Sequence, residues 1–379
     1  MATTLPTMST GVVAYFTDWT SGRYGPDAIP YDKVTHINYA FSLFDDQTWA
    51  PTITSGPILE QVVSRAHAKG AKVAVSIGGW TGSKYFSPMA ASASHRASFI
   101  SSTKAMVQQY GLDGIDLDWE YPGRTGMVCN VINKEQDALN FLTLLRELRD
   151  ALGSDKFISL AVRVQPFDGP SGPLDNVRAY AEYLDFINIM AYDINGSWSS
   201  KTAPNAPLAA SPEGGDPFSV LQSVQAWTSA GFPREKLVMG VPFYGRSLVT
   251  SQAPSANSMY TDFVKSVPQG DSDDAPWAEP CPGEVPVLSG QWKWKNLREQ
   301  GILTSPTQAA GGWERHWDNQ TQTPWLYNPS THQFISYDDP QSLSAKVAAI
   351  KEQGLAGAMV WALNQDNGEL IDTVARVRE

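Results

Sequence analysis

The chain has 379 residues, 42% of them hydrophobic, and a formal net charge of −11 at pH 7. This length allows two domains or one large barrel with an insertion. The acidic balance argues against nucleic acid and anionic membranes as partners, because both bind clustered Lys and Arg. No apolar run approaches the ~20 residues of a transmembrane helix. The start, MATTLPTMSTGVV, lacks the basic and apolar regions of a signal peptide, so we expect either a cytosolic protein or one whose signal peptide is missing from this chain.

Short segments rich in Val, Ile, Phe and Tyr recur along the chain and predict β-strands. In order, these segments begin at Gly11, His36, Lys72, Gly114, Phe157, Phe186, Lys236 and Gly357. Helical patterns, with an apolar residue at every third or fourth position, begin at Ile58, Arg96, Glu135, Phe218 and Ser342. Strands that alternate with helices indicate an α/β fold with a parallel sheet. With eight strands, the expected closure is a (β/α)8 TIM barrel.

One interval breaks this alternation. Between the seventh predicted strand and the last predicted helix lies a stretch rich in Trp, Pro, Gly and Ser. It is too long for a loop without structure of its own. We therefore expect a small α+β insertion domain over residues 247–336, between strands seven and eight. The barrel then comprises residues 11–246 and 337–379.

Residues 113–120 read DGIDLDWE and place several carboxylates inside an apolar run. Because strand side chains alternate between faces, Asp116, Asp118 and Glu120 share one face, which in a barrel points into the lumen. The apolar residues between them pack outward under the helices. Glu120 stands at the carboxyl end of the strand, where barrel enzymes hold their catalytic groups. Asp113 has the opposite parity, and we expect it to organise the start of the strand.

Closely spaced carboxylates in a low dielectric cannot all ionise. Such a ladder supplies an acid and an anion at one pH, as acid/base catalysis requires. Helix caps or a calcium site are the alternatives, but a calcium loop of the EF-hand type needs a run of polar ligands with a central glycine. We therefore expect no metal. None of the 5 His has the motif context of a base for serine-type catalysis, and 2 Cys are too few for a Cys-based zinc site.

Taken together, the motifs resemble the family 18 glycoside hydrolases, the chitinases, and among them secreted fungal chitinases. DGIDLDWE is similar to the family signature DxxDxDxE. Further motifs resemble the family's third, sixth, seventh and eighth strands, namely SIGGW at 76–80, MAYD at 190–193, GVPFYGR at 240–246 and AMVWALNQD at 358–366. The Trp-rich interval, ending WLYNPSTHQFISYDDP, resembles the chitinase insertion domain. The resemblance therefore covers nearly the whole chain.

The resemblance implies hydrolysis of the β-1,4 bonds between N-acetylglucosamine units of chitin, with retention and with assistance from the substrate. It assigns Glu120 as general acid and base, and Asp118 as the group that holds the acetamido N–H of the substrate. Asp116 would share a proton with Asp118, and Tyr192 would donate a hydrogen bond to the acetamido oxygen. No cofactor is implied. The expected partners are chitin and chitooligosaccharides, bound by a secreted monomer.

The resemblance also implies a set of substrate-binding residues. Trp361 would lie under the distorted sugar, with Trp80 and Trp19 as stacking platforms on either side of the scissile bond. The other matching cleft positions are Tyr15, Phe41, Met190, Asp193, Tyr244 and Arg246. Plain barrel packing is the alternative for each. Strand five departs from the family pattern, because Arg163 and Gln165 stand where many relatives carry a small residue and a proline, and this leaves the substrate preference open.

The positions of the two cysteines predict a disulfide. Cys129 follows the fourth predicted strand and Cys281 lies in the insertion. Both segments leave the same face of the barrel, so we expect a disulfide above the cleft, with two unrelated free thiols as the alternative.

The competing functions are a non-catalytic chitooligosaccharide-binding protein and an endo-β-N-acetylglucosaminidase acting on N-glycans. Glu120 favours an enzyme, and the tryptophan platforms with the insertion favour linear chitin.

Overall fold

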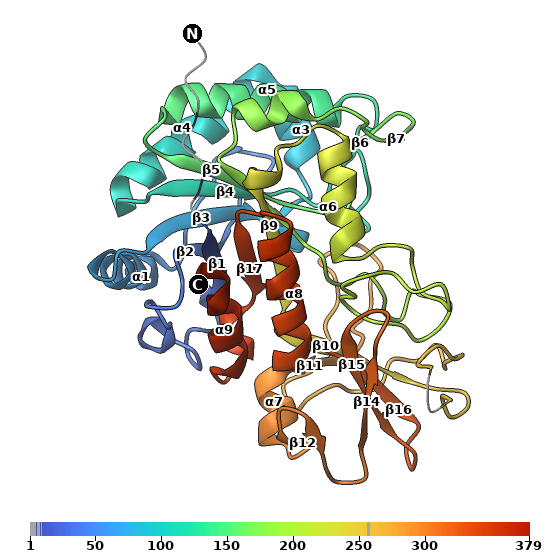
Figure 1. The fold of residues 1–379 in the computed structure, drawn as a ribbon. Coiled ribbons are helices and arrows are strands. Elements are labelled where there is room, and N and C mark those ends of the chain that lie inside the picture. The colour runs from blue at the N-terminus through green and yellow to red at the C-terminus, as the bar shows by residue number, and fades with distance from the viewer. Residues whose placement is uncertain (1–4, 6–7, 9, 256–257) are drawn as a thin grey trace.

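A closed barrel of parallel strands forms the centre of the molecule (Figure 1). The computed structural model describes residues 5, 8, 10–255 and 258–379, so most of the N-terminal segment 1–13, which the signal-peptide expectation concerns, lies outside the described residues. Each strand pairs with the next one along the chain, and the last closes against the first. The strands are β1 (Gly11–Thr17), β2 (His36–Ser42), β3 (Lys72–Gly78), β4 (Gly114–Asp118), β5 (Phe157–Val162), β8 (Phe186–Ile189), β9 (Leu237–Pro242) and β17 (Gly357–Trp361). The predicted TIM barrel is confirmed.

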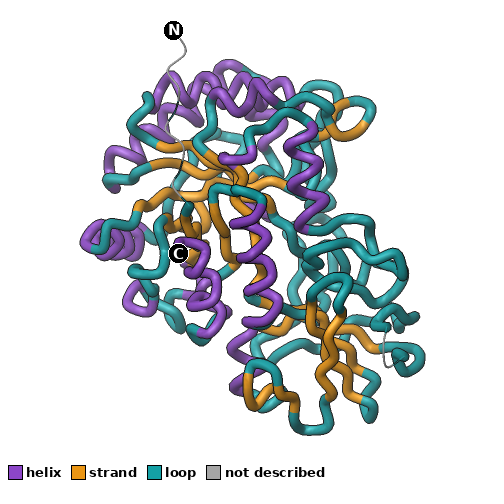
Figure 2. Tube along the Cα trace, in the orientation of Figure 1, coloured by secondary structure: helices purple, strands orange, loops and turns teal. Residues whose placement is uncertain are grey.

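Helices cover the outside of the barrel (Figure 2). The predicted helical segments correspond to α1 (Gly56–Ala68), α4 (Ala93–Tyr110), α5 (Asp137–Leu152), α6 (Val220–Ser229) and α8 (Pro340–Glu352). Shorter helices that the periodicity did not predict are α2 (Gly79–Gly82), α3 (Phe86–Ala91) and α9 (Glu369–Val374). Between β1 and β2 the chain makes only 3-10 turns, at Asp18–Thr20 and Pro26–Ala28. After β5 it makes the small hairpin of β6 (Asp168–Gly169) and β7 (Gly172–Pro173) and a 3-10 turn at Arg178–Glu182.

The insertion lies beside the barrel, at the lower right of Figures 1 and 2. Its antiparallel sheet has the order β11-β10-β16-β15-β14. The strands are β10 (Tyr244–Val249), β11 (Gln291–Lys293), β14 (Glu314–Asp318), β15 (Thr323–Asn328) and β16 (Gln333–Ser336), accompanied by α7 (Trp294–Glu299) and the ribbon of β12 (Leu303–Ser305) and β13 (Gln308–Ala309). An α+β insertion between the seventh and eighth barrel strands is thus confirmed. The expected boundary at residue 246 falls inside β10, and we propose that the inserted unit begins at Tyr244.

Several barrel strands end earlier than their sequence suggests, among them β4, β5, β8 and β17. The apolar, β-rich pattern continues past β4, β5, β8 and β17, but the strand pairing ends at Asp118, Val162, Ile189 and Trp361. The residues beyond these points have left the sheet at its carboxyl end. Because active sites of barrel enzymes lie at this end, the early endings release residues to line a cleft instead of completing a strand.

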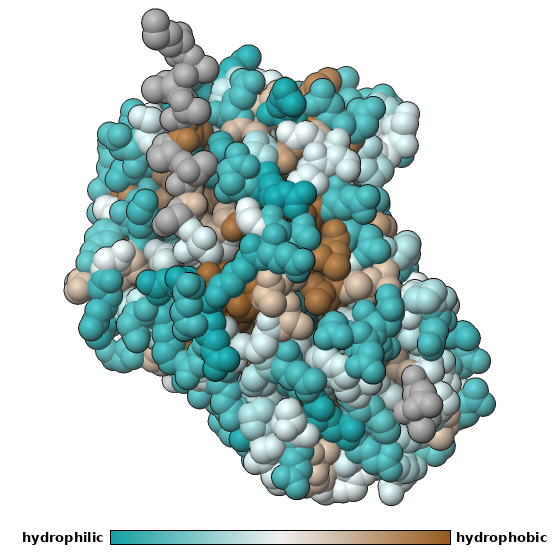
Figure 3. All heavy atoms as spheres, in the orientation of Figure 1, coloured by the Kyte–Doolittle hydropathy of each residue, from teal (hydrophilic) through white to brown (hydrophobic). Residues whose placement is uncertain are grey.

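Two apolar layers hold the barrel together. The outer layer lies between the strands and the helices and contains Ile115, Leu117 and Trp119, whose outward packing was predicted. Trp119 stacks on Phe86 of α3 with ring centroids 5.3 Å apart. The inner layer fills the lumen and includes Tyr15 of β1. Hydrophilic residues cover most of the face in Figure 3, and no helix in the described part of the chain is long and apolar enough to span a membrane.

Candidate active site

The carboxylates of DGIDLDWE separate into one at the base of β4 and three at its lumen face. Asp113 precedes the strand, where its Oδ2 accepts a hydrogen bond from the Val73 N–H at 2.8 Å and lies 2.8 Å from His67 Nε2. It therefore ties β4 to the start of β3 and to α1, as expected for a residue that organises the strand. Asp116, Asp118 and Glu120 are all buried.

Asp116 is the most tightly held of these acids. Its Oδ2 accepts hydrogen bonds from the Tyr15 hydroxyl and from Ser76 Oγ, each at 2.7 Å. Its Oδ1 accepts from Ser159 Oγ at 2.7 Å and from Asn188 Nδ2 at 3.4 Å. Burial raises the pKa of Asp116, and these hydrogen bonds oppose that rise. The donors come from β1, β3, β5 and β8, so Asp116 links five strands across the lumen.

Asp118 and Glu120 behave as one coupled pair. Burial and then the charge of Glu120 raise the pKa of Asp118 well above its ordinary value, and Asp118 Oδ1 is buried without a hydrogen-bond partner among the described residues. Burial likewise raises the pKa of Glu120 to about 7, against the opposing effects of the Tyr121 hydroxyl and Asp118. Near neutral pH the pair therefore retains a proton. The expected proton sharing between Asp116 and Asp118 stays a prediction, although the charge of Asp116 also raises the pKa of Asp118.

The backbone of Glu120 is fixed from both sides although it lies beyond the end of β4. Its N–H donates to Ser83 Oγ at 2.8 Å, and its carbonyl oxygen accepts from Asn130 Nδ2 at 2.9 Å. Ser83 Oγ also donates to the Asp118 carbonyl at 3.2 Å. These bonds replace the missing ladder contacts, so the carboxyl group of Glu120 is held in one place at the mouth of the barrel.

The MAYD motif places two side chains in the cleft. Burial and the charges of Asp118 and Glu120 raise the pKa of Tyr192 well above its ordinary value, which keeps its hydroxyl protonated and able to donate. Asp193 adopts a φ of 54°, in the left-handed region that asparagine and aspartate tolerate best among non-glycine residues. Its backbone N–H donates to Asn205 Oδ1 at 2.9 Å, which anchors this turn.

Asp193 is joined to the start of the insertion. Its Oδ1 accepts hydrogen bonds from the Tyr244 hydroxyl at 2.8 Å and from Arg246 Nε at 2.6 Å. The Arg246 guanidinium in turn lies over the ring of Trp198, 5.2 Å from its centroid. The three polar residues therefore form one charge-balanced unit along the wall of the cleft. Guanidinium hydrogens of Arg246 and the hydroxyl oxygen of Tyr244, as an acceptor, remain for a ligand.

An aromatic cluster forms the opposite part of the site. The ring of Trp361 lies 5.3 Å from that of Tyr15 and 5.8 Å from that of Phe41, measured between centroids. Trp19 stacks on Phe41 at 5.9 Å and remains 60% exposed. Flat rings in this arrangement offer apolar faces to the faces of sugar rings. These residues come from the ends of β1, β2 and β17.

The SIGGW motif carries a further exposed indole. Gly78 and Gly79 have φ values of 113° and 80°. A Cβ on Gly78 would lie 2.3 Å from the Asp118 carbonyl oxygen, and one on Gly79 would lie 2.7 Å from the ring of Phe41. Only glycine fits both positions. The resulting sharp turn brings Trp80, 37% exposed, to the rim of the cleft.

These segments enclose a cleft of about 740 Å³. The predicted site residues that line it are Tyr15, Phe41, Trp80, Asp118, Glu120, Met190, Tyr192, Asp193, Tyr244, Arg246 and Trp361. Asp116 lies beneath the cleft, and Trp19 stands outside the lining. Lining residues outside the predicted set are Tyr121, Arg124, Ala161, Arg163, Val164, Ile194, Trp198, Asp216, Phe218 and Glu279.

The departure in strand five faces this cleft. Arg163 Nη1 lies 3.6 Å from Asp168 Oδ1, and Arg163 Nη2 donates to Gln165 Oε1 at 2.8 Å. Arg124 also reaches Asp168, at 3.4 Å. Arg163 lines the cleft, and the carboxylate it pairs with is Asp168 of the β6 hairpin.

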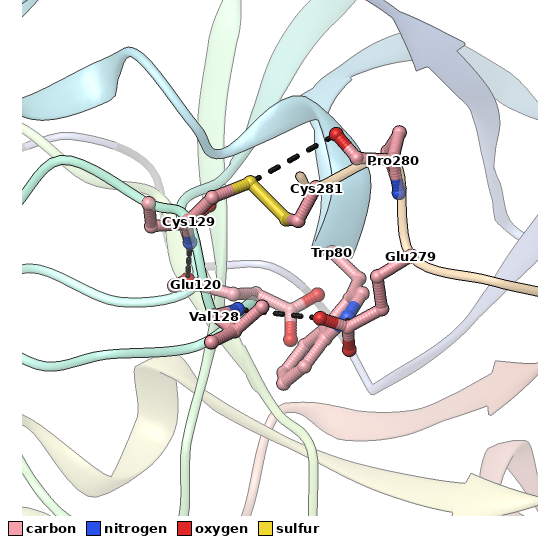
Figure 4. Close-up of a disulfide and its surroundings, with 8 residues drawn as sticks. Trp80, Glu120, Val128, Cys129, Glu279, Pro280 and Cys281 are labelled. Atoms are coloured by element: carbon pink, nitrogen blue, oxygen red, sulfur yellow. Dashed lines mark hydrogen bonds between the residues drawn. A yellow bond between two sulfur atoms is a disulfide. The ribbon is translucent and has the colours of Figure 1, made fainter. Parts of the chain in front are cut away.

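The predicted disulfide is present. Cys129 and Cys281 are bonded, with their Cα atoms 5.6 Å apart and their positions separated by 152 in the sequence. Figure 4 shows the bridge beside Glu120, with the loop after β4 on one side and the insertion on the other. The alternative of two free thiols is therefore wrong.

The sequence model of glycosyl hydrolases family 18 matches residues 11–366, and the chain belongs to this family. A chitinase-like effector of Moniliophthora roreri is 34% identical over 95% of this chain and 91% of its own length. The crystal structure of a chitinase from Rhizomucor miehei superposes with a TM-score of 0.92 at 37% identity, covering 98% of this chain and all of that one. The Group IV chitinase of Ostrinia furnacalis in complex with allosamidin gives a TM-score of 0.80 at 29% identity, over 97% and 98% of the two chains.

Proposed function

We propose that this protein is an active chitinase, which hydrolyses the β-1,4 bonds between N-acetylglucosamine units by a retaining, substrate-assisted mechanism with Glu120 as general acid and base. One observation carries the proposal: Glu120 stands buried at the mouth of the cleft, beside Asp118, with its pKa raised to about 7. A general acid works best when its pKa lies near the working pH. An ordinary surface glutamate would be ionised there and could not donate a proton.

The reaction begins with transfer of the Glu120 proton to the glycosidic oxygen, which leaves with the electron pair of the bond to the anomeric carbon. The carbonyl oxygen of the substrate's own N-acetyl group attacks that carbon and forms an oxazolinium ion. Asp118 accepts the acetamido N–H and offsets the positive charge, while Tyr192 donates to the acetamido oxygen. A water molecule, deprotonated by Glu120, then opens the ring, and two inversions give net retention.

The cleft walls support a polymer of N-acetylglucosamine as substrate. Trp361 supplies an apolar face directly beside the acids, and Trp80 and Trp19 extend this surface toward its ends. Asp193, Tyr244 and Arg246 supply polar groups on the other wall. We further propose that the protein acts outside the cell as a monomer, since a bridge such as Cys129–Cys281 persists in oxidising surroundings.

A second candidate function follows from one of the relatives. Because a chitinase-like effector is among the proteins that this chain resembles, capture of chitooligosaccharides without turnover is the competing proposal. The retained Glu120 and its raised pKa favour catalysis.

Product analysis separates these possibilities. We expect the protein to cleave chitohexaose and colloidal chitin, to leave cellohexaose intact, and to cut chitosan only after an acetylated sugar, because the nucleophile belongs to the substrate. Rapid NMR should show the β-anomer first. An initial α-anomer or cleavage of cellohexaose contradicts the mechanism. Tight binding of chitohexaose without products supports the competing proposal. Cleavage of N-glycan cores in preference to chitin would contradict both proposals and indicate an endo-β-N-acetylglucosaminidase.

A further inference from the structure

A segment of the insertion reaches over the rim of the cleft. Trp277 and Val287 pair through two backbone hydrogen bonds of 3.0 Å each, and the chain between them turns back on itself. We call residues 277–287 the rim arm. It carries Cys281, whose disulfide to Cys129 fixes the arm to the loop that follows β4 (Figure 4).

Glu279 of the rim arm points into the cleft and holds two other segments. Its Oε1 accepts a hydrogen bond from Trp80 Nε1 at 3.0 Å, and its Oε2 accepts from the Val128 N–H at 3.3 Å. Figure 4 shows this carboxylate between the indole of Trp80 and the loop of Cys129. One side chain thus connects the end of β3, the loop after β4 and the insertion.

This contact matters because it is the hydrogen bond that the structure shows at the indole N–H of Trp80. Trp80 follows two glycines of positive φ and is 37% exposed, so its side chain would otherwise sample several rotamers. Ordering a flexible side chain upon binding costs conformational entropy. A hydrogen bond to a carboxylate is stronger than one between neutral groups, and it sets the orientation of the indole before the substrate arrives.

We propose that Glu279 is a positioning residue, which the Cys129–Cys281 bridge places over the cleft so that its carboxylate orients the indole of Trp80 for stacking on a chitin chain. The inference rests on the proposed function, because it assigns Trp80 as a sugar platform. It makes the insertion, and not the barrel alone, responsible for the affinity of this end of the cleft. Glu279 does not touch the reacting atoms, so it acts on binding and leaves the chemical step unchanged.

Three substitutions test whether affinity depends on the charge of Glu279, on its hydrogen bonds, or on any acidic residue of the rim arm. Glu279→Leu removes both acceptors, whereas Glu279→Gln keeps a carbonyl oxygen that can accept from Trp80 Nε1. Glu284→Gln changes an exposed acid of the same arm and serves as the matched control. For Glu279→Leu we expect KM on colloidal chitin to rise about three- to tenfold, the range of one lost hydrogen bond. We expect kcat to change by less than about twofold, because a platform binds ground and transition states alike. Glu279→Gln should restore most of the affinity.

A binding measurement keeps the inference independent of turnover. Quenching of tryptophan fluorescence by chitohexaose should report the same loss of affinity in Glu279→Leu, and the double variant Cys129→Ser/Cys281→Ser should lose affinity in the same direction. An unchanged KM and Kd in Glu279→Leu, with an unfolding midpoint equal to that of the wild type, overturns the inference. Equal losses in kcat for the Leu and Gln variants overturn it as well. If the wild type binds chitohexaose without hydrolysing it, the proposed function fails. The fluorescence measurement of binding still tests the role of Glu279 in that case.

Discussion

The floor and the rim of the cleft are built in different ways. On the floor, strand register fixes the position of the acids. Asp116 pairs with Ser76 of β3 and with Ser159 of β5, so the side chains of these three residues all face the lumen. At the rim, Trp80 and Glu279 meet through side chains that are 199 residues apart in the sequence, beside a disulfide. Backbone ladders tolerate little change, whereas loop contacts vary readily. Under the proposed function, this difference assigns the chemistry to the barrel and the affinity of this end of the cleft to the loops.

The largest expected effect lies on the floor. Glu120→Gln keeps the shape of the side chain and removes the proton that it donates. General acid catalysis is commonly worth about 10²- to 10⁴-fold, so kcat on chitohexaose should fall by that factor while Kd changes little. Calorimetric titration of the variant measures Kd. Activity within a few-fold of the wild type would remove Glu120 from its assigned role.

The second effect concerns the bridge at the rim. Replacing both cysteines by serine releases a constraint on a long loop of the unfolded chain, and native disulfides of this kind contribute about 2–5 kcal/mol. We expect a lower thermal unfolding midpoint but retained kcat on short oligomers. In the wild type, denatured and unreduced, thiol titration should find no reactive cysteine. Two reactive thiols per chain, or an unchanged midpoint in the variant, would contradict this prediction.

The third prediction is a pH dependence that belongs to the floor alone. Because the pKa of Glu120 is raised to about 7, the acid form needed for the first step is present below that pH and is lost above it. We expect kcat/KM to decline by about tenfold per pH unit on the alkaline side. Rim variants such as Glu279→Leu should keep the same profile. A profile whose alkaline limb moves with a rim substitution would show that the two regions are not separate.

The smallest effects compare two tryptophans. Trp361→Ala removes the ring beside the acids and should lower kcat by about tenfold or more, because poor placement of the reacting sugar is costly. Trp80→Ala should mainly raise KM for polymer, by about the factor expected for Glu279→Leu. Initial rates on colloidal chitin and chitohexaose separate the two. Similar losses of kcat from both variants would show that the roles of floor and rim are misassigned.

The floor was predictable from the sequence because it depends on local alternation. The parity of DGIDLDWE placed Asp116, Asp118 and Glu120 on the lumen face without any knowledge of their neighbours. Strand ends were less predictable. The run from Lys236 continues in a β-like manner through Tyr244, yet β9 ends at Pro242 and Tyr244 pairs with the insertion. Pairing partners distant in the sequence decide such boundaries, and no local pattern reports them.

The contacts at the rim could not be predicted either, because they also join residues that are distant in the sequence. Glu279 lies in a Pro- and Gly-rich stretch without periodicity, and its partner Trp80 is far away in the chain. One signal for it was available: Glu279 stands two residues before Cys281, so the predicted disulfide already placed it near the loop after β4. The roles of the cleft residues follow from the resemblance and remain predictions. For the role of Asp116 the local pattern is silent, because its four hydrogen-bond donors all lie on strands other than its own.

The hydrogen bonds of Asp116 also bear on how such a protein can evolve. They join five strands, so losing this carboxylate leaves several buried donors without an acceptor, which a barrel tolerates poorly. Glu120 lies past the end of its strand and has no part in that closure. A single base change in its codon gives glutamine. One mutational step can thus turn a polysaccharide-degrading enzyme into a lectin-like protein with its fold intact, and descendants that take this route are expected to retain Asp116.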